Sequence, residues 1–175
     1  MAKRQRKNRR AYDAAAAQRR EQRALSRSLR GAAQSDERLA RQSQDLGALL
    51  GMDPYAFEEL VGDLVRTMGY DVTVTQRSGD GGVDIEAHDS HPMRGGTIIF
   101  SVKRYRHTVQ PAHVRDLYGT LRDHPRASRA VLVTTSHFGP SSHTFAADKP
   151  MSLITGSELL ALMRRQGLKL PEPPA

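Results

Sequence analysis

Two short stretches that alternate between apolar and polar residues decide the fold of this chain. The first is Val83-Asp-Ile-Glu-Ala-His88, and the second is Thr97-Ile-Ile-Phe-Ser-Val-Lys103. Successive side chains of a strand point to opposite faces, so Ser101 and Lys103 share one face of the second strand. A hairpin-like connection places the start of one strand beside the end of the next. We therefore expect Asp84 and Lys103 to meet at one edge of a sheet.

The flanking residues predict a mixed sheet between helices. Further strands are expected where alternating or continuous apolar residues cluster: 70–76, 129–135 and 151–155. Helices are expected where apolar residues recur at helical spacing or follow a capping residue and proline: 53–69, from Pro111 onward, 140–147 and 157–166. The resulting order, α-β-β-β-α-β-α-β-α, indicates an α/β fold with a mixed sheet and helices on both faces.

The positive charge of the chain is concentrated at its N-terminus. The 175 residues include 27 Lys and Arg against 19 Asp and Glu, a net charge of +8, and residues 1–30 alone hold 11 basic and two acidic residues. We interpret residues 1–50 as a basic, disordered or helical arm, residues 51–168 as the folded domain and residues 169–175 as a flexible tail. The arm is a candidate for contact with nucleic-acid phosphates, and the alternative is a solubilising extension. Its first basic residues are Lys3, Arg4, Arg6, Lys7, Arg9 and Arg10.

Composition excludes several classes of protein. The chain has no cysteine, which excludes a disulfide scaffold, a thiolate zinc site, an iron–sulfur cluster and a cysteine nucleophile. It has no apolar run near the roughly 20 residues that cross a membrane, and no hydrophobic segment follows the basic start. We expect a cytoplasmic protein without a membrane partner.

A carboxylate and a lysine that converge at a strand edge suit the hydrolysis of a phosphodiester. The carboxylate of Asp84 can hold Mg²⁺, a cation that prefers oxygen ligands, and the carbonyl of Val102 offers a further oxygen. Such an ion polarises the phosphate and lowers the pKa of a bound water. Lys103 can orient that water or stabilise the charge of the transition state. Arg104 and Arg106, which follow directly, are candidates for contact with phosphates.

Several motifs together resemble a known family. They occur in a fixed order: Phe57-Glu-Glu-Leu-Val61, Gly69-Tyr-Asp-Val72, Gly79-Asp-Gly-Gly-Val-Asp-Ile85, Val102-Lys-Arg-Tyr105, Val131-Leu-Val-Thr-Thr135 and Ile154-Thr-Gly-Ser-Glu-Leu159. This pattern resembles the catalytic domain of Mrr-type restriction endonucleases, within the PD-(D/E)xK nuclease superfamily, over roughly residues 52–165. The resemblance implies a restriction-endonuclease-like fold.

The resemblance also implies roles for individual residues. Asp84 matches the metal-binding aspartate, Lys103 the catalytic lysine and Glu58 a helix-borne glutamate placed near the metal. Ser101 departs from the pattern, because the family usually has Gln or an acid there. Its shorter hydroxyl is either a weak ligand that acts through a water or a filler without a catalytic role. The implied cofactor is Mg²⁺, with Mn²⁺ as the alternative, and the implied partners are DNA, a second copy of the chain and a protein that supplies specificity.

The sequence favours a Mg²⁺-dependent DNA endonuclease of the restriction type. Three alternatives stay open: a catalytically weak or inactive DNA-binding protein with a nuclease fold, a DNA repair or junction nuclease, and an RNA-binding accessory protein that acts through the arm. Ser101 is the residue that favours the inactive alternative.

Overall fold

A computed structural model of the chain describes residues 20, 27, 30–75, 82–91 and 95–171. The chain divides into two compact units, Met1–Ser43 and Gln44–Ala175. In the first unit, residues 30–43 are helical. Residues 44–50, which lie within the predicted arm, are helical in the second unit, where Leu49 is fully buried in the same core as Phe57. The second unit therefore begins at Gln44, ahead of the predicted domain start at residue 51.

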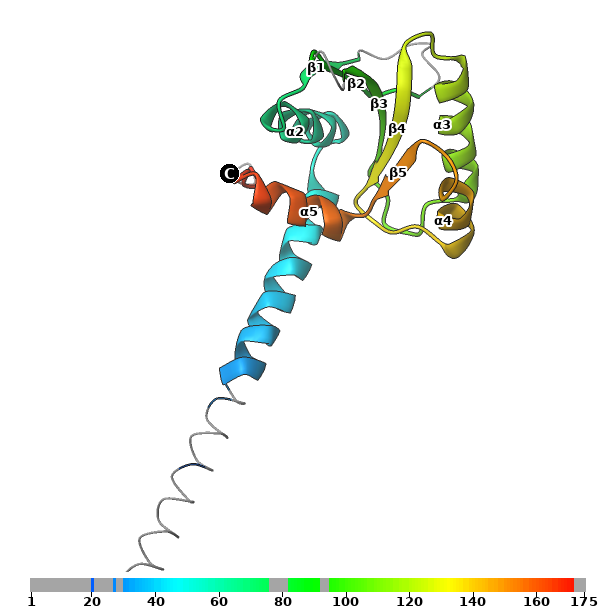
Figure 1. Cartoon of the computed structure of the whole chain (residues 1–175). Helices are drawn as coiled ribbons and strands as arrows, with labels where there is room; N and C mark the ends of the chain where they lie inside the picture. Colours follow the sequence, from blue (N-terminus) through cyan, green and yellow to red (C-terminus); the bar gives the residue numbers. More distant parts are fainter. Residues whose placement is uncertain (1–19, 21–26, 28–29, 76–81, 92–94, 172–175) are drawn as a thin grey trace, which may run out of the picture. The chain divides into compact units, whose positions relative to one another are not determined.

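A five-stranded mixed sheet, in the order β1-β2-β3-β4-β5, forms the centre of the second unit (Figure 1). The strands are β1 (Asp71–Val74), β2 (Ile85–Asp89), β3 (Gly96–Lys103), β4 (Ala127–Thr134) and β5 (Met151–Ile154). The first three pair antiparallel, and β4 and β5 continue the sheet in parallel. The predicted element order and the mixed sheet are confirmed.

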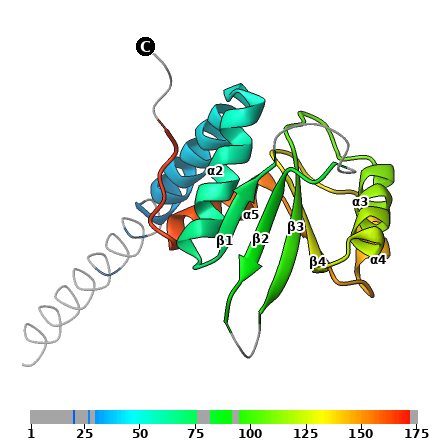
Figure 2. The same ribbon diagram turned by 90° about the horizontal axis from the view of Figure 1, so that it is seen from above.

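Helices cover both faces of this sheet. They are α2 (Pro54–Thr67), α3 (Pro111–Asp123), α4 (Pro140–Ala146) and α5 (Gly156–Arg165). Figure 2 shows α2 and α5 on one side of the sheet and α3 and α4 on the other. The predicted cap of α2 is present, because the Asp53 side chain accepts a hydrogen bond from the Tyr55 backbone N–H at 2.9 Å. At the start of α5, Thr155 forms a capping box with Glu158, which the sequence expectations did not include.

Each face of the sheet has its own apolar core. Phe100 and Val102 of β3 pack in the core beneath α2 and α5, whereas Ile99 packs in the core beneath α3 and α4. Because side chains alternate along a strand, Ser101 and Lys103 lie on the same face as Ile99. The predicted alternation of this strand is thus confirmed.

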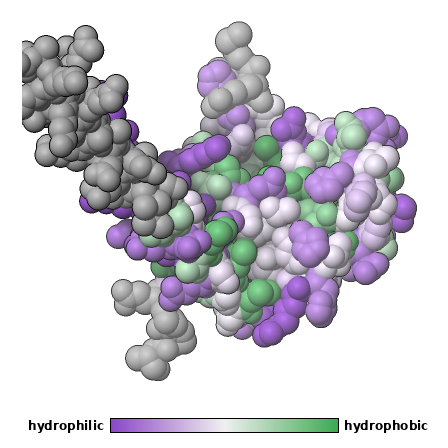
Figure 3. Space-filling view, turned by 90° about the horizontal axis from the view of Figure 1, so that it is seen from below, coloured by the Kyte–Doolittle hydropathy of each residue, from purple (hydrophilic) through white to green (hydrophobic). Residues whose placement is uncertain are grey.

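One face of the molecule carries both apolar and hydrophilic residues. In the space-filling view of Figure 3, small apolar patches are interspersed with hydrophilic residues. No helix in the described part of the chain is long and apolar enough to span a membrane.

Candidate active site

The register of β2 and β3 positions the aspartate of the candidate site. Ile85 lies opposite Phe100, so Asp84, one residue earlier, lies near Ser101. The Asp84 backbone N–H donates to the Phe100 carbonyl at 2.8 Å, and its carbonyl accepts from the Thr75 N–H at 3.0 Å. These bonds hold Asp84 in the sheet just before the first residue of β2.

A glycine directs the chain into this position. Gly82 has a φ of +80°, a left-handed conformation that side chains other than glycine's rarely adopt. The segment 76–81, which contains the rest of the predicted glycine-rich turn, lies outside the described residues.

One oxygen of the Asp84 carboxylate receives three hydrogen bonds from β3. Oδ2 accepts from the Val102 backbone N–H at 2.5 Å, from the Ser101 hydroxyl at 3.4 Å and from the Lys103 ammonium at 3.5 Å. The Lys103 and Asp84 side chains are 27% and 19% exposed. Partial burial weakens screening by water, so the attraction between the two charges is stronger than that of an exposed pair. The structure thus brings together Asp84, Ser101 and Lys103.

The oxygen donors at this point fit a hard divalent cation. Among the described residues, no hydrogen bond ends on the other carboxylate oxygen, Oδ1. The Val102 N–H bonds to Asp84, and the carbonyl and N–H of one strand residue point to the same side, so the Val102 carbonyl faces the aspartate. The Lys103 carbonyl faces β4 instead, where it accepts from the Thr134 hydroxyl at 2.8 Å.

The site has few protein ligands for a metal. Over the described ranges, no three His, Cys, Asp or Glu side chains lie together as a metal-binding group. Mg²⁺ commonly binds through one or two carboxylates and keeps several waters, so a site with few carboxylates suits it better than it suits a cation that needs an all-protein cage.

Glu58 lies on α2, outside the strands that carry Asp84 and Lys103. It is half-buried on α2, next to the buried Phe57. The apolar side of α2 packs against the face that carries Phe100 and Val102, opposite the face that carries Lys103. The role of Glu58 near a metal stays a prediction.

The basic residues after Lys103 have different surroundings. Arg104 is exposed, and its guanidinium donates to the Leu50 carbonyl at 2.7 Å, so part of it binds the end of the preceding helix. Arg106 is exposed. The arm residues Lys3, Arg4, Arg6, Lys7, Arg9 and Arg10 lie outside the described residues.

Two buried threonines, Thr134 at the end of β4 and Thr135 just after it, hold the chain around Lys103 by hydrogen bonds. The Thr134 hydroxyl donates to the Lys103 carbonyl, and the Thr135 hydroxyl donates to the Tyr105 carbonyl, each at 2.8 Å. Both threonines are at most 4% exposed. The only signal in the sequence is two polar residues at the end of an otherwise apolar strand.

Comparison with known proteins supports the predicted family. A family model described as "Restriction endonuclease" (Mrr_cat) matches residues 49–163, which is more than half of the chain. A search of curated protein sequences found no match.

Solved structures share the fold. A DNA modification-dependent restriction endonuclease, AspBHI, superposes with a TM-score of 0.61 at 21% identity, over 73% of this chain and 36% of that one. MspJI restriction endonuclease, solved in complex with a 27-mer oligonucleotide, superposes with a TM-score of 0.53 at 23% identity, over 71% and 31%. AF1548, a protein of unknown function, gives 0.55 at 16% identity, over 67% and 68%. The chain thus spans about a third of the length of the two restriction endonucleases.

Proposed function

We infer that this chain, which belongs to the Mrr-type restriction endonuclease family, hydrolyses phosphodiester bonds of DNA with the help of a divalent metal ion. Membership of the family places it among the endonucleases. The observation that carries the proposal is the distance of 3.5 Å between the Asp84 carboxylate and the Lys103 ammonium, both partly buried, at the end of β3. The further assignment to the restriction type rests on the family alone.

Each residue of the site has its own proposed role. Asp84 and the Val102 carbonyl would hold Mg²⁺, or Mn²⁺, with Glu58 as a further candidate ligand. The ion, when bound, supplies Lewis-acid polarisation of the phosphate and lowers the pKa of a water. Lys103 places its ammonium beside that phosphate, where it stabilises negative charge in the transition state and orients the attacking water. Ser101 contributes only a neutral hydroxyl beside Asp84.

Nicking of supercoiled plasmid DNA in Mg²⁺ or Mn²⁺ tests this proposal. Asp84→Ala and Lys103→Ala should each lower the rate at least about 100-fold, because each removes a group that stabilises the transition state. The chain offers a matched control in a second Asp–Lys ion pair, Asp148 with Lys149. Asp148→Ala and Lys149→Ala should cut like the unmodified protein. Equal rates for all four variants would refute the proposal.

We propose DNA as the substrate, and we propose that the basic arm contacts the phosphates of the DNA backbone. Neutralising Lys3, Arg4, Arg6, Lys7, Arg9 and Arg10 should weaken DNA binding and flatten the dependence of log affinity on log salt concentration. The same number of neutral substitutions in the arm, at Ala and Gln positions, provides the control. Arg104 and Arg106 are proposed as phosphate contacts near the site, and their substitution should weaken binding to a similar extent for all DNA sequences.

Ser101 favours one second candidate, a DNA-binding protein with a nuclease fold and little catalysis. In that case Asp84→Ala and Lys103→Ala would bind DNA as tightly as the unmodified protein, and none of the three would cut in either metal. The plasmid assay, combined with a binding measurement, separates the two functions.

We also propose a second copy of the chain, a specificity partner and a cytoplasmic location. A cut through both strands of a duplex calls for two active sites, which a homodimer would supply. A specificity partner would supply base recognition. A location in the cytoplasm agrees with a substrate of cellular DNA.

A further inference from the structure

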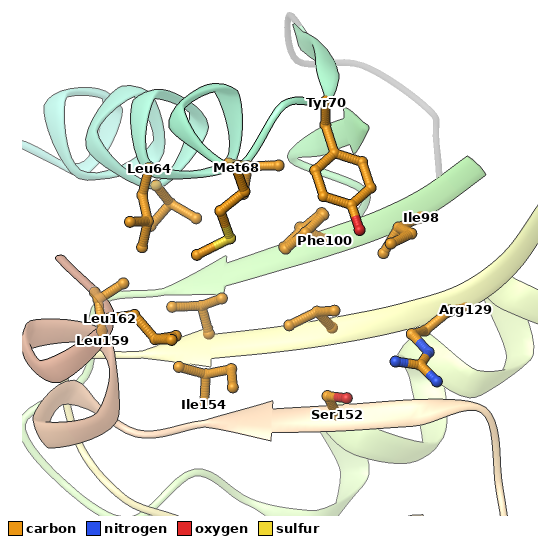
Figure 4. Close-up of a pocket in the computed structure, with 14 residues that line it drawn as sticks. Leu64, Met68, Tyr70, Ile98, Phe100, Arg129, Ser152, Ile154, Leu159 and Leu162 are labelled. Carbon is orange, nitrogen blue, oxygen red and sulfur yellow. The ribbon is translucent and has the colours of Figure 1, made fainter. Parts of the chain in front are cut away.

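An apolar pocket lies on the face of the sheet opposite Asp84 and Lys103. It has a volume of about 190 Å³ and lies between α2 and α5 over β3, β4 and β5. Figure 4 shows Leu64 of α2, Met68 just after the end of α2, and Leu159 and Leu162 of α5 pointing over the strands. The strand residues beneath, such as Phe100, belong to the core on this face.

The polar groups of the pocket gather at one end. In Figure 4, Arg129 and Ser152 lie away from Leu159 and Leu162, and the Tyr70 hydroxyl lies beside Ile98 on the same half of the pocket. The pocket therefore has an apolar end beside α5 and a polar end with one positive charge. Such a gradient matches a molecule that has an apolar body and a single polar head.

Arg129 has its positive charge available at this end. It is exposed, and over residues 30–75, 82–91 and 95–171 no acidic side chain pairs with it. A guanidinium binds a carboxylate through two parallel hydrogen bonds, which gives such a contact both strength and orientation. The charge thus selects an anionic head over a neutral or cationic one.

The size of the pocket limits the apolar body. An apolar cavity of about 150 Å³ admits a single benzene ring. A pocket of about 190 Å³ suits one ring or a short alkyl chain. A long-chain lipid would extend well beyond it.

We propose that this pocket binds a small apolar carboxylate, with the carboxylate on Arg129 and the apolar body against Leu159 and Leu162. The site is separate from the proposed nuclease site, because Phe100, Val131 and Val133 beneath it face away from Lys103. The inference does not depend on whether the chain cuts DNA.

Calorimetric titration of the full chain with three probes of equal chain length tests the proposal. Octanoate should bind at least about tenfold tighter than octylammonium, with 1-octanol between them, because only the carboxylate pairs with Arg129. Arg129→Gln should remove most of the advantage of octanoate over 1-octanol and leave the affinity for 1-octanol unchanged. Arg126→Gln, at another exposed arginine near the start of β4, should change neither value.

A second variant examines the apolar end. Leu162 is only partly buried, so Leu162→Phe should be tolerated by the fold and should weaken both octanoate and 1-octanol by filling the pocket. Circular dichroism would establish that each variant is folded. The absence of octanoate binding to the unmodified protein, or an unchanged preference for octanoate in Arg129→Gln, would overturn the proposal. Plasmid cutting by Arg129→Gln should equal that of the unmodified protein, so failure of this site and failure of the nuclease site are distinguishable.

Discussion

Two Asp–Lys ion pairs in this chain have opposite characters. Lys149 and Asp148 are neighbours in the sequence and lie 2.6 Å apart, with the lysine side chain 19% and the aspartate side chain 79% exposed. Lys103 and Asp84 are separated by 19 positions and lie 3.5 Å apart, with side chains 27% and 19% exposed. The shorter contact is thus the one whose carboxylate lies at the surface.

The difference shows that distance alone would not single out the pair that we propose as catalytic. The Asp148 carboxylate is largely exposed, so water screens its attraction to Lys149 and the pair contributes little. The Asp84 carboxylate is instead surrounded by three donors of β3 and keeps one oxygen without a hydrogen bond from the described residues. Lys149 also packs on the Phe145 ring, with its ammonium 4.3 Å from the ring centroid, and this contact favours a structural role for that pair.

The largest expected contrast between the pairs comes from replacing lysine by arginine. Lys103→Arg should lower the cutting rate roughly 100-fold, because the larger, planar guanidinium cannot occupy the place of a compact ammonium beside Asp84. Lys149→Arg should cut at the normal rate, because a guanidinium also stacks on an aromatic ring. Single-turnover cutting rates at saturating DNA provide the measurement. Similar rates for the two variants would remove the distinction between the pairs.

Removal of the threonine hydroxyl behind Lys103 should have an intermediate effect. Thr134→Val loses the hydrogen bond to the Lys103 carbonyl and should slow cutting about tenfold, with a loss of about 1–2 kcal/mol in the free energy of unfolding. Thr134→Ser keeps the hydroxyl and should recover most of the rate. Thr144→Val, at an exposed position of α4, serves as the control. If Thr134→Val loses stability but keeps its rate per folded molecule, the threonine only supports the fold.

A longer side chain at position 101 should improve metal binding. Ser101→Gln adds an amide oxygen near Asp84 and should lower the metal concentration for half-maximal cutting by about threefold to tenfold. Ser101→Ala should leave it nearly unchanged, because the hydroxyl is 3.4 Å from the carboxylate and forms only a weak hydrogen bond. A higher metal requirement in a folded Ser101→Gln protein would contradict this expectation.

The smallest effect concerns the surface pair. A hydrogen bond from Lys149, together with its charge, holds the pKa of Asp148 below its usual value. The carboxylate therefore stays ionised to a lower pH than usual, and its favourable contact is lost as the pH falls through the lowered pKa. Lys149→Gln should raise the pKa of Asp148 toward the usual value in an NMR titration and leave the cutting rate unchanged. A pKa of Asp148 that does not move would show that Lys149 does not cause the shift.

Local patterns predicted the elements of this fold well. The Asp53-Pro54 start of α2 and the alternation in β3 depend on neighbouring residues, so the sequence shows them directly. Ends of elements were less predictable. Residues 70–76 were expected as a strand, and β1 covers Asp71–Val74; the Thr75 N–H still donates to the Asp84 carbonyl beyond it, and residue 76 lies outside the described residues.

Contacts between distant segments were harder to predict. The hydroxyl of Thr134 supports Lys103 only because β3 and β4 pair in parallel in one particular register. Arg104, expected as a phosphate contact, also binds the Leu50 carbonyl, at a separation of 54 positions. A local sequence pattern does not predict such a hydrogen bond, because the packing of the elements determines which distant residue becomes the partner.

The amino-acid sequence was enough to indicate the family, the mixed sheet, the basic N-terminal segment and the residue types of the candidate site. These depend on composition, periodicity and motif order, which are properties of the chain before it folds. Three features required the folded chain: the use of one carboxylate oxygen of Asp84 by three donors, the support of Lys103 by Thr134, and the pocket that ends at Arg129. Each brings together side chains from different elements, and only the register of the sheet and the packing of helices on it determine which of them meet.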